Sequence, residues 1–163
     1  MNKCQQELVM QRLRTFRKKM QIVDVFGHQL YLVQSKIISM SKTYIVSDAD
    51  GNKVATIQQR LSMVVPKYKI CIVGTEPYFI RRNISLLHNY SFKGVPWKAY
   101  GDFLGYRYQV QNDREEILFA ICKDLDSWNN RYALKIFDSQ HTLQGICTAL
   151  AIDAAMCAVR SKN

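Results

Sequence analysis

Histidine is the residue type that most often carries acid-base or zinc chemistry, and it is sparse in this chain. The three histidines are His28, His88 and His141, and no G-x-S-x-G motif supplies a serine nucleophile for any of them. Their spacing also lacks the H-E-x-x-H pattern of zinc enzymes. We therefore expect solvent-facing histidines, no metal or other cofactor and no catalytic residues. The chain is predicted not to be an enzyme.

The cysteines follow neither a disulfide pattern nor a zinc pattern. There are five of them, an odd number without a C-x-x-C pair, at positions Cys4, Cys71, Cys122, Cys147 and Cys157. A thiol among apolar residues behaves as a small hydrophobic group. We interpret the five as buried or incidental thiols of a reducing compartment. Because residues 1–20 contain no continuous apolar stretch, no secretory leader is expected, and the sequence predicts a cytoplasmic protein.

Two short motifs resemble ligand-binding loops but are better interpreted as turns. Asp48-Ala49-Asp50-Gly51 begins like a calcium loop, yet it lacks a third ligand before the glycine, and its twelfth position is Gln59 instead of glutamate. Gly101 and Gly105 lack the lysine of a phosphate-binding loop. Both motifs are predicted to belong to hairpins.

The clearest candidate binding site is a group of cations. The chain carries 23 Lys and Arg against 13 Asp and Glu, a net charge of +10, which favours anionic partners. The candidate residues are Arg12, Arg14, Arg17, Lys18 and Lys19, with Arg81 and Arg82 as a second group. Each cation near an anionic bilayer contributes about 1 kcal/mol, so five would give salt-sensitive adsorption to phospholipid headgroups. Two alternatives stay open. Nucleic-acid binding ranks lower, because no helix-turn-helix or RNP-like motif is present, and the cations could also form a solvated edge that discourages strand pairing.

Asp153 is the one charged side chain between Thr142 and Val159. Burying a carboxylate without partners costs several kcal/mol, so Asp153 should be neutral, paired or near the mouth of the structure. The structural interpretation is a hydrogen-bonded residue that holds the register of its helix. The functional interpretation is a proton-linked or ligand-contacting group in a residual cavity.

Two kinds of element must position these residues. Residues 143–159 (LQGICTALAIDAAMCAV) read as a helix without a polar face, which should be enclosed on every side. This segment is too short and too interrupted for a membrane span of about 18–20 apolar residues. The preceding chain alternates with period two, as in Tyr68, Ile70 and Ile72 against Lys67, Lys69 and Cys71. Polar hairpin turns are predicted at 26–28, 48–52, 73–75 and 112–114.

The number of strands favours a closed barrel. We count about twelve strands, between the eight that side chains alone can fill and the sixteen or more that leave a channel. The interior would hold one helix of about 10 Å diameter. The sequence therefore predicts a mainly β fold: a closed barrel of about twelve antiparallel strands around a central, buried C-terminal helix, in a single domain over residues 1–163.

A series of motifs along nearly the whole chain carries a family resemblance. In order, they are Leu8 to Arg12, Ile22 to Asp24, Ser47 to Ala55, Ile57 to Leu61, Pro66 to Tyr68, Trp97, the glycine-rich Gly101 to Tyr106, and Ala149 to Asp153. This series resembles the LURP-one-related proteins, whose members share the tubby-like C-terminal fold. The resemblance implies a barrel of about twelve strands around a central helix.

For function, the resemblance implies less. Tubby proteins bind phosphoinositides through basic residues, and the related phospholipid scramblases act at membranes. No tubby lipid-binding motif aligns with this chain, so no residue role is transferred. The leading hypothesis is a non-enzymatic cytoplasmic binding module for anionic phospholipid headgroups that associates peripherally with membranes. The alternative is an interaction or scaffold protein whose barrel exterior docks a protein partner.

Overall fold

The computed structural model describes residues 3–13, 19–38, 41–60, 65–83, 90–103, 107–123 and 131–160. Within these residues the chain forms twelve strands, a short 3-10 helix η1 (Ser139–His141) and the helix α1 (Thr142–Arg160). The strands are β1 (Gln6–Leu13), β2 (Lys19–Asp24), β3 (Gln29–Ile38), β4 (Ser41–Asp48), β5 (Lys53–Arg60), β6 (Lys67–Ile72), β7 (Tyr78–Arg82), β8 (Tyr90–Lys93), β9 (Lys98–Asp102), β10 (Arg107–Gln111), β11 (Ile117–Lys123) and β12 (Arg131–Ile136).

The strands close into a barrel. Each strand pairs antiparallel with its neighbours in sequence, and β1 pairs with both β2 and β12, so no strand edge is left open. For example, Leu8 lies opposite Asp24 on one side and Leu134 on the other. The predicted closed barrel of about twelve antiparallel strands is confirmed.

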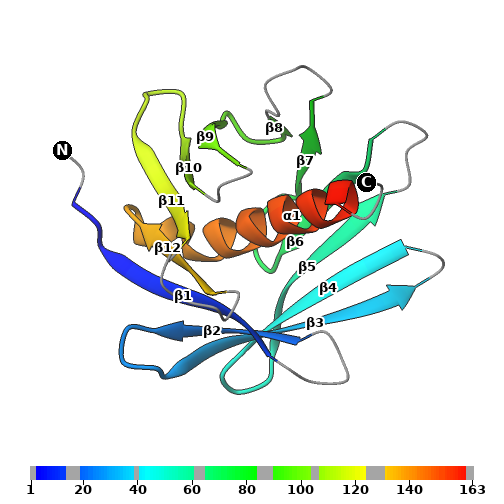
Figure 1. The fold of residues 1–163 in the computed structure, drawn as a ribbon, viewed down its shortest axis with the longest axis vertical. Coiled ribbons are helices and arrows are strands. Elements are labelled where there is room, and N and C mark those ends of the chain that lie inside the picture. Colours follow the sequence, from blue (N-terminus) through cyan, green and yellow to red (C-terminus); the bar gives the residue numbers. More distant parts are fainter. Residues whose placement is uncertain are drawn as a thin grey trace.

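Helix α1 runs through the space that the strands surround (Figure 1). Residues 145–156 are all buried, and twelve consecutive helical residues span every face of the helix. The prediction of an enclosed helix over residues 143–159 is confirmed for residues 145–156, whereas residues 143, 144, 157 and 158 are half-buried. Gly145 allows the helix to approach the wall closely, because a Cβ atom there would lie 2.9 Å from Ile136 Cδ1 and 3.2 Å from Phe119 Cγ.

The alternation of side chains builds the core around the helix. On β6, Tyr68, Ile70 and Ile72 are buried and face the interior, whereas Lys67 and Lys69 face out. Five even-numbered strands also contribute one core tyrosine each. They are Tyr44, Tyr68, Tyr90, Tyr108 and Tyr132.

Three hairpin turns share one geometry. In each, an Asp or Asn side chain accepts hydrogen bonds from the backbone amides two and four residues later, at 2.8–3.0 Å; the three residues are Asp24, Asp48 and Asn112. The fourth residue of each turn has a positive φ. In two of the turns this residue is a glycine, Gly27 or Gly51, which adopts positive φ readily, whereas in the third it is Glu115. The segment that begins like a calcium loop is therefore a turn, as predicted.

Candidate functional site

Basic residues gather at one end of the barrel. Because the antiparallel strands follow sequence order, the connections from each odd strand to the next even strand share one end of the barrel, and the others share the opposite end. Helix α1 follows β12, so its C-terminus points toward the first end (Figure 1). We call this the basic end, because cations lie at or within two residues of most of its strand termini. They are Arg12, Lys19, Lys36, Lys42, Arg60, Lys67, Arg81, Arg82, Arg107, Lys123 and Arg131.

The opposite end, which we call the turn end, carries most of the described carboxylates, together with cations such as Lys53, Lys98 and Arg114. The acidic residues at or beside its turns are Asp24, Asp48, Asp50, Glu76, Asp113, Glu115, Glu116 and Asp138. Among the residues that the structure describes, the acidic ones toward the basic end are Asp102 and Asp153. The barrel thus carries a charge separation along its axis, and an anionic surface would attract it by the basic end.

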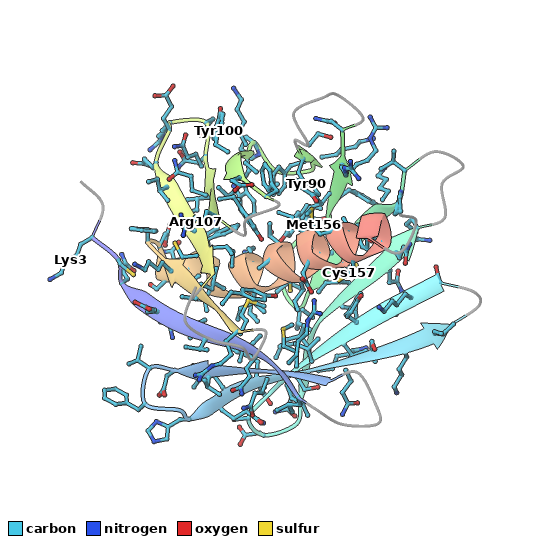
Figure 2. The ribbon with its side chains drawn as sticks, in the orientation of Figure 1. Lys3, Tyr90, Tyr100, Arg107, Met156 and Cys157 are labelled. Atoms are coloured by element: carbon cyan, nitrogen blue, oxygen red, sulfur yellow. The ribbon has the colours of Figure 1, made fainter. Side chains whose placement is uncertain are left out.

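One arginine of the basic end is directed into the interior. Arg12 follows Leu8 and Met10 on the inward face of β1, and its Nη2 atom donates to Asp153 Oδ2 at 2.6 Å. The same nitrogen lies 3.5 Å from Cys157 Sγ, one helical turn further along α1. Met156 and Cys157 lie near the C-terminal end of α1, which Arg12 reaches (Figure 2). Asp153 is thus a paired carboxylate, 8% exposed, that ties the helix to the first strand.

The electrostatics around this pair follow from burial. Although burial opposes its charged form, the charge of Asp153 and the hydrogen bonds to Asp153 and Cys157 raise the pKa of Arg12. Burial, and then the negative charge of Asp153, raises the pKa of Tyr44, and burial does the same for Tyr68. Both tyrosines are therefore neutral hydrogen-bonding groups, and neither can act as a base near neutral pH.

The predicted headgroup residues that the structure describes do not all share one face of the wall. Arg14, Arg17 and Lys18 lie outside the described residues, and Lys19 begins β2. Arg81 is exposed on the outer face of β7, whereas its neighbour Arg82 pairs with the buried Tyr90 and faces the interior. The second group predicted from sequence is therefore divided between the two faces of the barrel wall.

The structure brings together a row of outward residues, four of them cations, of which sequence reasoning had named only Arg81 as a candidate. On the outer face of the wall, five residues of the consecutive strands β5 to β9 lie directly opposite one another, each paired in register with the next. They are Arg60, Lys67, Arg81, Ser91 and Lys98. We call this the cationic row. Its members are far apart in the sequence and become neighbours through strand register. The sequence did place Lys67 on the outer face of its strand, but alternation does not reveal which residue of the next strand lies opposite.

Other chemistry finds little support in the described part of the chain. There, no group of three or more His, Cys, Asp or Glu side chains is arranged to hold a metal ion. Two histidines bond to nearby carboxylates, His28 to Asp24 at 2.9 Å and His141 to Asp138 at 3.0 Å. The buried thiol of Cys147 has a pKa raised by burial, which favours its unreactive neutral form. A search of the same residues finds no helix that is long and apolar enough to cross a membrane.

Comparison with known proteins places the chain in a family. A curated relative, the uncharacterized protein YxjI of Bacillus subtilis (strain 168), is 26% identical over 143 residues, which cover 87% of this chain and 86% of that protein. A protein of Arabidopsis thaliana solved by X-ray crystallography superposes with a TM-score of 0.58 at 14% sequence identity, covering 92% of this chain and 94% of that one. This likeness shows a shared fold, the tubby-like one. The LURP-one-related family profile matches residues 6–153, and the chain belongs to the LURP-one-related family.

Proposed function

We propose that this domain is a non-enzymatic binding module whose basic end binds anionic phospholipid headgroups. The observation that carries the proposal is the uneven distribution of charge along the barrel axis. Cations lie at or within two residues of most strand termini of the basic end, whereas most of the described carboxylates lie at the turns of the other end. An end-on approach places the cations against the anionic surface and keeps the acidic turns away from it. In this proposal the protein is cytoplasmic and associates peripherally with the membrane.

The magnitude is sufficient for reversible adsorption. A cation near an anionic membrane contributes about 1 kcal/mol, and this attraction decays over a Debye length of about 8 Å at physiological ionic strength. The residues that we assign to headgroups are Arg14, Arg17, Lys18, Lys19 and Arg81. Arg82 lies at the same end but contributes less, because its side chain faces the interior. Arg12 belongs to the same end but contributes less, because its charge is already neutralised by Asp153 at 2.6 Å.

Vesicle co-sedimentation tests the proposal. The protein should bind vesicles that contain about one third phosphatidylglycerol or phosphatidylserine and ignore vesicles of phosphatidylcholine, and binding should fall steeply with salt. The triple variant R14Q/R17Q/K18Q should weaken partitioning about 100-fold, because three contributions of about 1 kcal/mol are removed. The matched control K3Q/K53Q/R114Q removes the same charge from exposed residues toward the turn end and should bind as the parent does. Equal binding to neutral and anionic vesicles, or equal loss in both variants, would contradict the proposal.

A second candidate function, protein docking, is favoured by one observation. The β2–β3 turn carries Val25 and Phe26 at 60% and 82% exposure, which is unusual for two adjacent apolar side chains. A partner that covers this turn would be lost in V25S/F26S, while vesicle binding would persist. Co-purification of a stoichiometric partner that is insensitive to V25S/F26S would exclude this turn as the docking site.

A further inference from the structure

The cationic row crosses the outer wall of the barrel from β5 to β9. Its five positions are joined by four direct register pairs: Arg60 with Lys67, Lys67 with Arg81, Arg81 with Ser91, and Ser91 with Lys98. With adjacent strands about 4.8 Å apart, the row is about 19 Å long. Because barrel strands tilt, it begins at the basic end with Arg60 and reaches the turn end at Lys98.

The row is electrostatically costly in the free protein. Like charges placed directly opposite each other on neighbouring strands destabilise a sheet, and Arg60, Lys67 and Arg81 make two such pairs in succession. Within the described part of the chain, the ion pairs of the protein involve Arg12, His28 and His141, and none of them neutralises the row. Arg60, Arg81 and Lys98 are exposed and therefore accessible to a ligand. An extended anionic chain along the row would remove the repulsion.

A second row of outward residues runs parallel to the cationic row. On each strand, its member lies two residues away from the member of the cationic row. It consists of Gln58, Lys69, Phe79 and Lys93, again as direct register pairs. Phe79 is an aromatic ring on an outer face, and Lys67 of the cationic row lies over it with Nζ 4.4 Å from the ring centroid. In the free protein, Lys67 thus uses the face of Phe79 in place of an anion.

We infer that this outer wall binds single-stranded nucleic acid, with phosphates on the cationic row and a base stacked on Phe79. A phosphate group would draw Lys67 off the ring, and the exposed face would then accept a base. Single-stranded chains combine these two features, since their phosphates follow a basic track and their bases are free to stack. A duplex would keep its bases within its own stack, and a polyanion without bases would have no use for Phe79. The inference does not depend on the lipid proposal.

Fluorescence anisotropy with a labelled 12-nucleotide oligothymidylate tests the inference. With four cations engaged, the logarithm of the association constant should fall with the logarithm of salt concentration at a slope of about −3. The double variant K67Q/K98Q should reduce the slope by about 1.4 and weaken binding about tenfold at 0.15 M salt. The control K3Q/K53Q carries the same net charge and should bind as the parent does.

Phe79 separates stacking from simple charge attraction. F79L should weaken oligonucleotide binding about 5- to 150-fold without changing the salt slope, and F79W should preserve binding. Circular dichroism and thermal unfolding establish that each variant is folded. Retention of full affinity in F79L, equal losses in both double variants, or tighter binding of inorganic polyphosphate through the same row would overturn the inference. The variant R14Q/R17Q/K18Q keeps the outer wall intact, so it should lose vesicles and retain the oligonucleotide if both proposals hold.

Discussion

Replacing Arg12 should destabilise this protein more than replacing Asp153, although both changes break the same ion pair. The pair joins Arg12 Nη2 to Asp153 Oδ2 at 2.6 Å, and the two side chains are 38% and 11% exposed. Removal of Arg12 leaves a carboxylate that is almost fully enclosed. Neutralising Asp153 leaves a guanidinium group that already reaches solvent and can be hydrated.

The expected magnitudes follow from these exposures. Removing one partner of a fully buried pair costs about 3–5 kcal/mol, whereas an exposed pair contributes about 0–1 kcal/mol. For this half-exposed arginine we expect R12Q to cost about 2–3 kcal/mol of unfolding free energy. D153N should cost about 1 kcal/mol, because its amide oxygen can still accept a hydrogen bond from Arg12. The exposed cation Lys36 lies at the same end, and K36Q should change stability by less than about 0.5 kcal/mol.

Urea unfolding of the two single variants and the double variant R12Q/D153N measures these terms. The double-mutant cycle should give a coupling energy of about 1–2 kcal/mol, since the two side chains contact each other directly. A larger loss in D153N than in R12Q would refute the argument from burial. A coupling energy near zero would show that the observed contact does not hold α1 to β1.

Three further predictions concern local packing and turns. Glu115 has φ = 63° where the equivalent turns have glycine, so E115G should raise the unfolding free energy by about 0.5 kcal/mol in thermal or urea unfolding; a loss would show that its side chain compensates for the strain. In an ordinary helix, replacing Gly by Ala is stabilising. Here G145A would place a Cβ atom 2.9 Å from Ile136 Cδ1, so it should lower the free energy of unfolding by about 1–3 kcal/mol. A gain in stability would contradict the close packing. Hydrogen bonds from the side chain and backbone of Asn52 lower the pKa of Asp48 below its usual 3.8. The ionised carboxylate therefore stabilises the fold above pH 3.8, and this contribution is lost as the pH falls through the lowered pKa of the folded state. Between pH 2 and 5, the free energy of unfolding should fall less steeply with decreasing pH in D48N than in the parent chain. Equal slopes for the two proteins would show that Asp48 makes no such contribution.

The sequence was sufficient for the architecture because the decisive signals are local. A helix whose residues 145–156 offer no polar face can be accommodated only where it is covered on all sides. Period-two alternation around Tyr68 and Ile70 assigns the buried face of a strand without knowledge of its partners. Turn residues such as Asp48 and Gly51 mark the hairpins, because their short side chains or positive φ angles are required there. The number of strands that these signals give, together with the enclosed helix, also predicted that the sheet closes into a barrel.

The candidate sites depend on register, which local signals do not determine. Arg12 and Asp153 are 141 residues apart, and their pairing requires both the inward face of β1 and the depth of α1 in the barrel. The alignment of Arg60, Lys67 and Arg81 likewise depends on how each turn sets the next strand. A shift of one residue in any pair would turn these side chains to the opposite face. The sequence analysis therefore grouped Arg81 with Arg82 because they are adjacent in the chain, whereas in the structure they face opposite sides of the barrel wall.

Because helix α1 is enclosed, the two proposed binding sites use the outside of this fold. Helix α1 and the inward side chains form one continuous core, so the charged residues that remain for recognition lie at the strand ends and on the outer wall. The C-terminal end of α1 carries a partial negative charge, which the cations around the basic end offset. The cationic row starts at this end with Arg60 but finishes at the turn end with Lys98. A membrane that contacts the basic end would therefore cover only the first part of the row, and the segment around Phe79 and Lys98 would remain open to a second anionic ligand.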